Sequence, residues 1–87
     1  FNADVKVYPN PATSVATIDV NLQQSQKLSV ILLDMNGRVV YTVPVTGYNS
    51  GSNKIAVPVS DLAPGTYLFT LHNETGSMMF SGRLLKQ

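Results

Sequence analysis

Apolar and polar side chains alternate along most of this 87-residue sequence, and clusters of Gly, Pro or Asn interrupt the alternation at intervals of roughly 8–12 residues. A period of two places successive side chains on opposite faces of a β-strand, and no long stretch repeats with the period of a helix. The pattern predicts seven strands: Asp4–Tyr8, Val15–Leu22, Lys27–Met35, Arg38–Val45, Lys54–Val59, Thr66–His72 and Ser77–Leu85. The polar stretch at residues 47–53 is expected to be a flexible loop, with Tyr48 available to contact a partner.

Seven short strands separated by turn signals are typical of a sandwich of two antiparallel sheets. The length allows one domain, residues 1–87, with one thin core. Leu62-Ala63-Pro64-Gly65-Thr66-Tyr67 is similar to the corner of an immunoglobulin-like sandwich, where a tyrosine hydroxyl ties a connection to a strand. We therefore expect an all-β, immunoglobulin-like, seven-stranded antiparallel β-sandwich.

Asn36-Gly37 is the strongest turn signal in the sequence, because a two-residue type I′ hairpin needs positive φ at both central positions. Such a turn predicts that Leu32 faces Tyr41, Val30 faces Val43 and Leu28 faces Val45 on one apolar side, with Ile31 opposite Thr42 and Ser29 opposite Pro44 on the other. Arg38 is expected to reach Asp34 across the turn. Since Pro44 has no N–H to donate, its strand is expected at a sheet edge.

A second hairpin is predicted around Asn73-Glu74-Thr75-Gly76. With a two- or four-residue loop, Phe69 faces Phe80, Leu71 faces Met78 and Tyr67 covers Gly82, as aromatic rings do over strand glycines. Asn73-Glu74-Thr75 also matches a glycosylation sequon, but its place in a tight turn favours the turn interpretation.

Catalytic chemistry needs acids, bases or nucleophiles that converge on one site. This sequence has one histidine, His72, five dispersed carboxylates and no cysteine, so we expect no enzyme activity, no metal site and no cofactor. The net charge of +1 comes from scattered Lys and Arg residues, which argues against nucleic acid as a partner. No apolar run is long enough to insert directly into a membrane as a helix. The start at Phe1, without Met or a signal-type segment, suggests a fragment of a longer secreted protein.

Four motifs in order give the sequence its strongest resemblance: Tyr8-Pro9-Asn10-Pro11, Leu33-Asp34-Met35-Asn36-Gly37-Arg38, Pro64-Gly65-Thr66-Tyr67 and the end Gly82-Arg83-Leu84-Leu85-Lys86-Gln87. Together they span the whole chain, which resembles the type A C-terminal sorting domains of the type IX secretion system. The resemblance implies that the type IX translocon recognises this domain and exports an N-terminal passenger from the periplasm across the outer membrane. It further implies that a sortase-like protease removes the domain at the cell surface.

Family motifs place recognition on the last strand, and the remaining motif residues are expected to be scaffold. The recognition residues would be Ser81, Gly82, Arg83, Leu84, Leu85, Lys86 and Gln87, and the scaffold residues Pro9, Asn10, Pro11, Asp34, Gly37, Arg38, Gly65 and Tyr67. A terminal strand suits this role because a free edge presents backbone groups to which a partner can add a strand. Lys86 is expected to add a charge near the end.

Two other functions share the same fold. A fibronectin-type or carbohydrate-binding accessory module would have a similar sandwich, although the sequence lacks the Trp common in such folds. A structural spacer of a surface protein would also share every predicted strand. In each case free strand edges could pair two copies into a homodimer.

Overall fold

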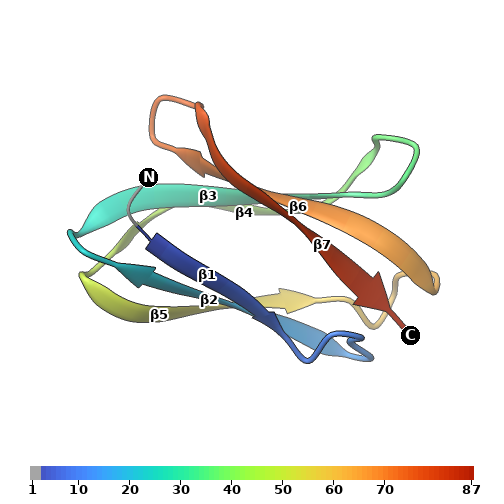
Figure 1. Cartoon of the computed structure of the whole chain (residues 1–87). Helices are drawn as coiled ribbons and strands as arrows, with labels where there is room; N and C mark the ends of the chain where they lie inside the picture. The colour runs from blue at the N-terminus through green and yellow to red at the C-terminus, as the bar shows by residue number, and fades with distance from the viewer. Residues whose placement is uncertain (1–2) are drawn as a thin grey trace.

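A three-stranded and a four-stranded antiparallel sheet pack face to face in the computed structural model, which describes residues 3–87 (Figure 1). The strands are β1 (Ala3–Tyr8), β2 (Val15–Leu22), β3 (Gln26–Leu33), β4 (Val39–Tyr48), β5 (Gly51–Pro58), β6 (Gly65–Asn73) and β7 (Met78–Lys86). The described residues include no helix, and hence none that could cross a membrane. The prediction of an all-β sandwich of seven antiparallel strands is confirmed.

The strand order is β1-β2-β5 in the smaller sheet and β4-β3-β6-β7 in the larger one. β2 and β3 follow each other in the chain but lie in different sheets, so the connection between them crosses the sandwich. β4 is an edge strand, as predicted from Pro44. β7 forms the opposite edge of the larger sheet.

The core lies between the sheets and is built by alternate residues of each strand. On β2, for example, Ala16, Ile18, Val20 and Leu22 are buried while the residues between them face outward. The fully buried large side chains are Leu28, Leu32, Leu71, Leu84, Val20, Val30, Val57 and Val59. Burial of each stabilises the fold by roughly 1.5–3 kcal/mol.

The hairpin between β3 and β4 differs from the predicted type I′ turn. No residue other than glycine has positive φ in the described chain, and at this turn only Gly37 does, with φ 84°. The Gly37 N–H donates to the Asp34 carbonyl at 3.0 Å, and the Asp34 N–H donates to the Arg38 carbonyl at 2.9 Å. This is the geometry of a type I turn followed by a left-handed glycine.

An irregularity far from the turn shifts part of the β3–β4 register. The pairs Leu32–Tyr41, Val30–Val43 and Ile31–Thr42 are confirmed. The predicted pairs Leu28–Val45 and Ser29–Pro44 are wrong, because an irregularity between Leu28 and Val30 places Leu28 opposite Thr46. A β-bulge of this kind adds a residue to one strand and turns its neighbours to the other face, which leaves Val45 exposed.

The hairpin between β6 and β7 repeats the same turn, and with an irregularity between Leu71 and His72 this makes the predicted register wrong by two residues. Gly76 has φ 90°, its N–H donates to the Asn73 carbonyl, and the Asn73 N–H donates to the Ser77 carbonyl. The observed pairs are Phe69–Gly82, Leu71–Phe80 and Tyr67–Leu84. Gly82 is therefore covered by Phe69 rather than by Tyr67: a Cβ added to Gly82 would lie 2.7 Å from the Phe69 ring.

The predicted loop at residues 47–53 is largely strand. β4 continues to Tyr48 and β5 begins at Gly51, which leaves Asn49 and Ser50 at the turn. The Asn53 side-chain amide donates to the carbonyls of Asn49 and Gly51 at 2.7 and 3.0 Å and holds the turn in place. Composition predicted a flexible loop because these polar residues have low strand propensity. Pairing of β4 with β3 and of β5 with β2 outweighs that low propensity.

Candidate functional site

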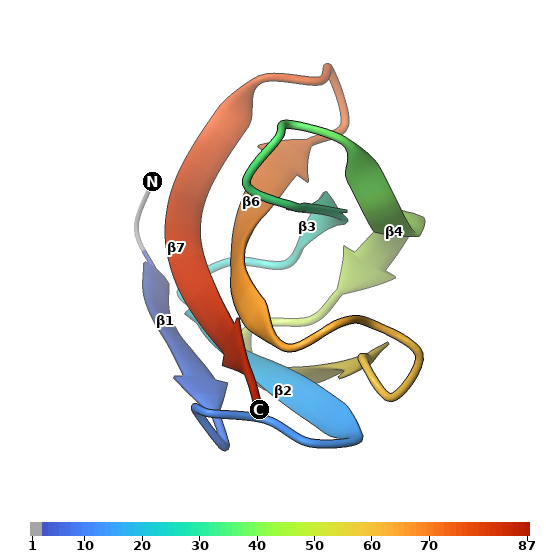
Figure 2. The same cartoon turned by 90° about the vertical axis from the view of Figure 1, so that its right-hand side faces the viewer.

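The four sequence motifs, far apart in the chain, meet at one end of the sandwich. β1, β3, β5 and β7 all run toward this end, so the segments after β1, β3 and β5 and the end of β7 lie there, as the end-on view in Figure 2 shows. We call this end, formed by residues 9–12, 34–38, 62–67 and 83–87, the motif pole. The first described residue of β1 lies at the other end of the molecule (Figure 1), whose longest dimension is 35 Å.

Residues 10–12 clasp the outer edge of β7. The Asn10 side-chain oxygen accepts a hydrogen bond from the Leu85 N–H at 2.9 Å. The Ala12 N–H donates to the Leu85 carbonyl and the Ala12 carbonyl accepts from the Gln87 N–H, both at 2.8 Å. The Tyr8-Pro9 and Asn10-Pro11 peptide bonds are both cis. The motif around Asn10 therefore holds the end of β7. Ala12, a fully buried residue that was not among the predicted motif residues, takes part in the same contact.

The segment before β6 makes side-chain contacts with β6 and with β7. The Tyr67 hydroxyl donates to the Ala63 carbonyl at 2.6 Å, which confirms the predicted tie between a tyrosine and its connection. The Lys86 ammonium donates to the Leu62 carbonyl at 3.1 Å, and the residue is only 8 % exposed. The charge that Lys86 was expected to add near the end of the chain is therefore largely buried. Alternation along β7 puts every second residue inside, and Leu84 and Lys86 share that side.

The predicted recognition residues therefore fall into two groups. Ser81, Arg83, Leu85 and Gln87 face solvent, while Leu84 and Lys86 are buried and Gly82 lies under the Phe69 ring. A partner that binds along β7 of the intact domain meets the first group. The second group contributes to the fold.

The edge of β7 is open only in part. Leu85 and Gln87 use their outward backbone groups in the clasp. By the period of two, the backbone groups of Ser81 and Arg83 point the same way as those of Leu85, and within residues 3–87 they meet no strand on that side. A partner could extend the sheet beside Ser81 and Arg83 without displacing the clasp.

Comparison with known protein families gives a match over residues 6–84 to the secretion system C-terminal sorting domain. The chain belongs to this family. It is a type IX secretion sorting domain, which interacts with the type IX secretion machinery and is exported through the periplasm to the cell surface or beyond. A comparison with curated proteins found no match.

The match covers most of the motif pole of this sorting domain. Residues 10–12 of the clasp fall within the matched range of residues 6–84, whereas their partners Leu85 and Gln87 follow it. Two hairpins of the sorting domain share one polar pattern: an Asp or Asn, then two residues, then Gly. This repeated pattern is the signal that could have identified both turns from the sequence.

At the pole, Asp34 organises the first of these hairpins. Its Oδ1 accepts from the N–H groups of Asn36 and Arg38, both at 2.9 Å, and its Oδ2 accepts from the Arg38 Nε at 3.3 Å, as predicted. The Arg38 N–H hydrogen bond is the main cause that lowers the pKa of Asp34 below its ordinary value of 3.8, and the Asn36 N–H and the Arg38 side chain act in the same direction. Asn73 accepts from Thr75 and Ser77 in the equivalent way at the other hairpin, so the sequon asparagine has a structural role in its turn.

Other candidate groups of the sorting domain lie away from the pole. His72 is half-buried, with its Nε2 2.8 Å from the Thr70 hydroxyl and its Nδ1 3.2 Å from the Gly76 carbonyl. Tyr48 lines a groove of about 680 Å³ at the opposite end, together with polar residues such as Gln26 and Asn49. Its contact with a partner stays a prediction. No group of three potential metal ligands occurs within residues 3–87.

Proposed function

We propose that the motif pole is the surface by which the type IX translocon recognises this domain, and that the domain itself catalyses nothing. The observation that supports the proposal is the convergence of four motifs, separated by up to 75 positions in sequence, on one end of the sandwich. The clasp and the Lys86 contact tie three of these segments together in the fold, and exposed side chains of β7 lie beside them. Of the sequence-predicted recognition residues, Ser81, Arg83, Leu85 and Gln87 are the ones a translocon would contact.

The proposal includes the fate of the exported protein. A passenger joined ahead of Phe1 would travel through the periplasm with this domain and cross the outer membrane, and a sortase-like protease at the surface would then cut the chain near residues 1–4. Phe1 and Asn2 lie outside the described residues. Because β1 starts at the end opposite the motif pole, the translocon and the passenger would occupy separate ends of the domain.

The alternatives are a carbohydrate-binding or fibronectin-type accessory module and a structural spacer. Pairing of two copies through a free edge, such as that of β4 or β5, also remains a prediction. Sedimentation of the purified domain across a range of concentrations tests the dimer.

Export of a reporter tests the proposal directly. Deleting Arg83 to Gln87 would remove the buried Leu84 and Lys86 and so confuse recognition with folding. The sharper variant is Arg83→Ala with Leu85→Ala, since both side chains are exposed. Fused behind a periplasmic reporter in a type IX-competent strain, the unchanged domain should deliver the reporter to the surface or medium, and the double variant should leave it in the periplasm.

A matched control uses the outer face of the smaller sheet. Lys6→Ala with Val15→Ala removes one exposed cation and one aliphatic side chain that is 44 % exposed, the same exposed fraction as Leu85. This control should be exported normally. Periplasmic retention of the unchanged fusion, with the domain shown to be folded, would instead favour the accessory module or the spacer.

A further inference from the structure

The outer faces of the two sheets differ in chemistry. The outer face of the β1-β2-β5 sheet carries paired charges: Lys54 lies 3.1 Å from Asp19 and its ammonium sits 5.9 Å from the centre of the Tyr8 ring. This face also exposes Tyr8 and Val15, whereas toward the motif pole the outer face of the β4-β3-β6-β7 sheet and the adjoining hairpin expose four large apolar side chains. These are Met35, Val39, Leu68 and Leu85, of which Met35 is 71 % exposed. Neighbouring exposed apolar residues of this kind mark an interaction site more often than isolated ones do.

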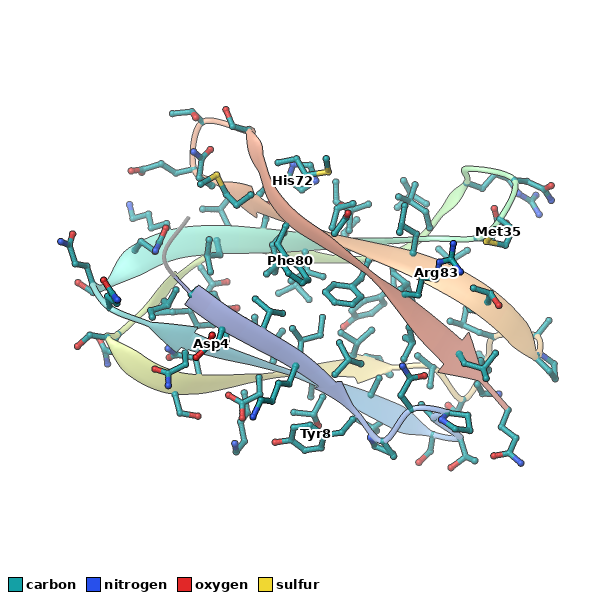
Figure 3. The ribbon with its side chains drawn as sticks, viewed as in Figure 1. Asp4, Tyr8, Met35, His72, Phe80 and Arg83 are labelled. Atoms are coloured by element: carbon teal, nitrogen blue, oxygen red, sulfur yellow. The ribbon has the colours of Figure 1, made fainter. Side chains whose placement is uncertain are left out.

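Two of these side chains, Met35 and Leu68, line a pocket of about 350 Å³. Leu33 and Leu68 form its floor on β3 and β6, the β3–β4 hairpin contributes Met35, and Arg83 stands at its edge on β7. Figure 3 shows the Met35 and Arg83 side chains on the same outer side of this sheet, at the end where the motifs gather. The volume is roughly ten times the 30 Å³ that one water occupies in the liquid, so the pocket can admit an apolar side chain.

The two arginines near the pocket differ in their partners. Arg38 is neutralised by Asp34, whose two oxygens together accept three hydrogen bonds within the hairpin. Arg83 has no carboxylate within 4.0 Å and makes no side-chain hydrogen bond to any residue in the range 3–87. Lys86 is buried, so its charge does not reach this surface. The pocket thus carries one available cation.

We propose that this pocket binds a peptide segment of the secretion machinery in which an aliphatic or aromatic residue stands next to an Asp or Glu. The apolar side chain enters between Leu68 and Met35, and the carboxylate pairs with the Arg83 guanidinium, whose fork of N–H donors matches a carboxylate in geometry. A single available cation beside an apolar cavity fits one carboxylate, whereas a polyanionic lipid would need several cations. The inference rests on the proposed export function and names the feature that the translocon reads.

Peptide binding tests the chemistry independently of export. The folded domain is titrated, with its backbone amides followed by NMR, with acetyl-Leu-Asp-Leu-amide and acetyl-Leu-Asn-Leu-amide. The Asp peptide should shift the amides of Leu33, Leu68 and Arg83 saturably and bind roughly tenfold more tightly than the Asn peptide, since a hydrogen bond to a charged group is worth about one such factor. Arg83→Gln should remove that preference, and Lys6→Gln on the other sheet should leave it intact. Equal binding of the two peptides, or saturable shifts only elsewhere, overturns the proposal.

Export separates this inference from the proposed function. Arg83→Gln and Met35→Ser each change one exposed side chain at the pocket, and each should reduce the exported fraction of the reporter by about tenfold or more. Their matched controls, Lys6→Gln and Val15→Ser, should not reduce it. If both pocket variants are exported normally while the unchanged domain directs export, the pocket is not the recognition feature and the proposed function stands. If the unchanged domain directs no export, the proposed function fails and the peptide titration alone decides the chemistry of the pocket.

Discussion

The side chain of Asn10 accepts a hydrogen bond from the backbone N–H of Leu85 at 2.9 Å and so joins the segment after the first strand to the end of the last one. Both partners lie at the surface, next to the two backbone hydrogen bonds that Ala12 makes with β7. The contact orients the exposed residues of β7 that we propose the translocon meets.

Asn10→Ala should lower the free energy of unfolding by about 0.5–1.5 kcal/mol, the usual contribution of one hydrogen bond. It should also accelerate hydrogen exchange of the Leu85 amide more than that of amides elsewhere on β7, because only that donor loses its acceptor. Urea unfolding and amide exchange measure the two effects. Gln24→Ala, in an exposed turn, is the control and should change neither. Unchanged exchange at Leu85 would show that the Asn10 side chain does not hold the strand.

Tyr67→Phe removes only the hydroxyl that donates to the Ala63 carbonyl. We expect a loss of about 1 kcal/mol in the free energy of unfolding, since the ring stays buried and the carbonyl can turn to water. Tyr41→Phe is the matched control, because the Tyr41 hydroxyl has no hydrogen-bond partner within residues 3–87. Equal losses from the two substitutions in urea unfolding would contradict the role of the tie.

Gly82→Ala should destabilise the domain by roughly 1–3 kcal/mol through overpacking. The new methyl would lie 2.7 Å from two atoms of the Phe69 ring, and that ring is held in the core with its centre 6.0 Å from that of Phe80. Gly82→Ala should cost less stability in a Phe69→Leu background than in the unchanged domain. The smaller leucine leaves the space that the new methyl needs. Gly47→Ala has open space around the added methyl and no positive φ, so its thermal unfolding should stay near that of the unchanged domain.

Acid should weaken the fold through Asp19 and Asp34. Hydrogen bonds from Lys54 and then Ser52 lower the pKa of Asp19, and the Arg38 N–H is the main cause for Asp34. Each carboxyl has a lower pKa when folded than when unfolded, so the unfolded chain binds more protons, and stability falls as the pH drops below about the ordinary value of 3.8. The midpoint of thermal unfolding should decline over that range.

The combined substitution Asp19→Asn and Asp34→Asn should flatten this decline. Asp61→Asn is the control, because the Asp61 side chain makes no hydrogen bond to the described part of the chain. An equally steep decline in the double variant would assign the acid sensitivity to other groups.

The alternation of apolar residues was enough to predict seven strands and the sandwich, because burial of one face of a sheet fixes that period. It could not give the turn types, because Asp34 and Asn73 bind their own hairpin amides and favour a type I turn with a left-handed glycine. The predicted pairing of Phe69 with Phe80 depended on the assumed turn, and Phe69 pairs with Gly82 instead. The pairing of β2 with β5 and of β3 with β6 joins segments far apart in the sequence, so the motif pole emerges only from the structure.

The clasp between residues 10–12 and 85–87 makes the candidate signal depend on the end of β7 and on the segment after the first strand. A polypeptide whose synthesis stops short of Leu85 has no partner for Asn10, and one that has not folded presents Arg83 and Leu85 without the surface around them. The candidate signal is therefore complete only in a chain that includes residues 85–87 and has folded. Secretion that relies on it would leave behind chains that stop before Leu85 and chains that have not folded.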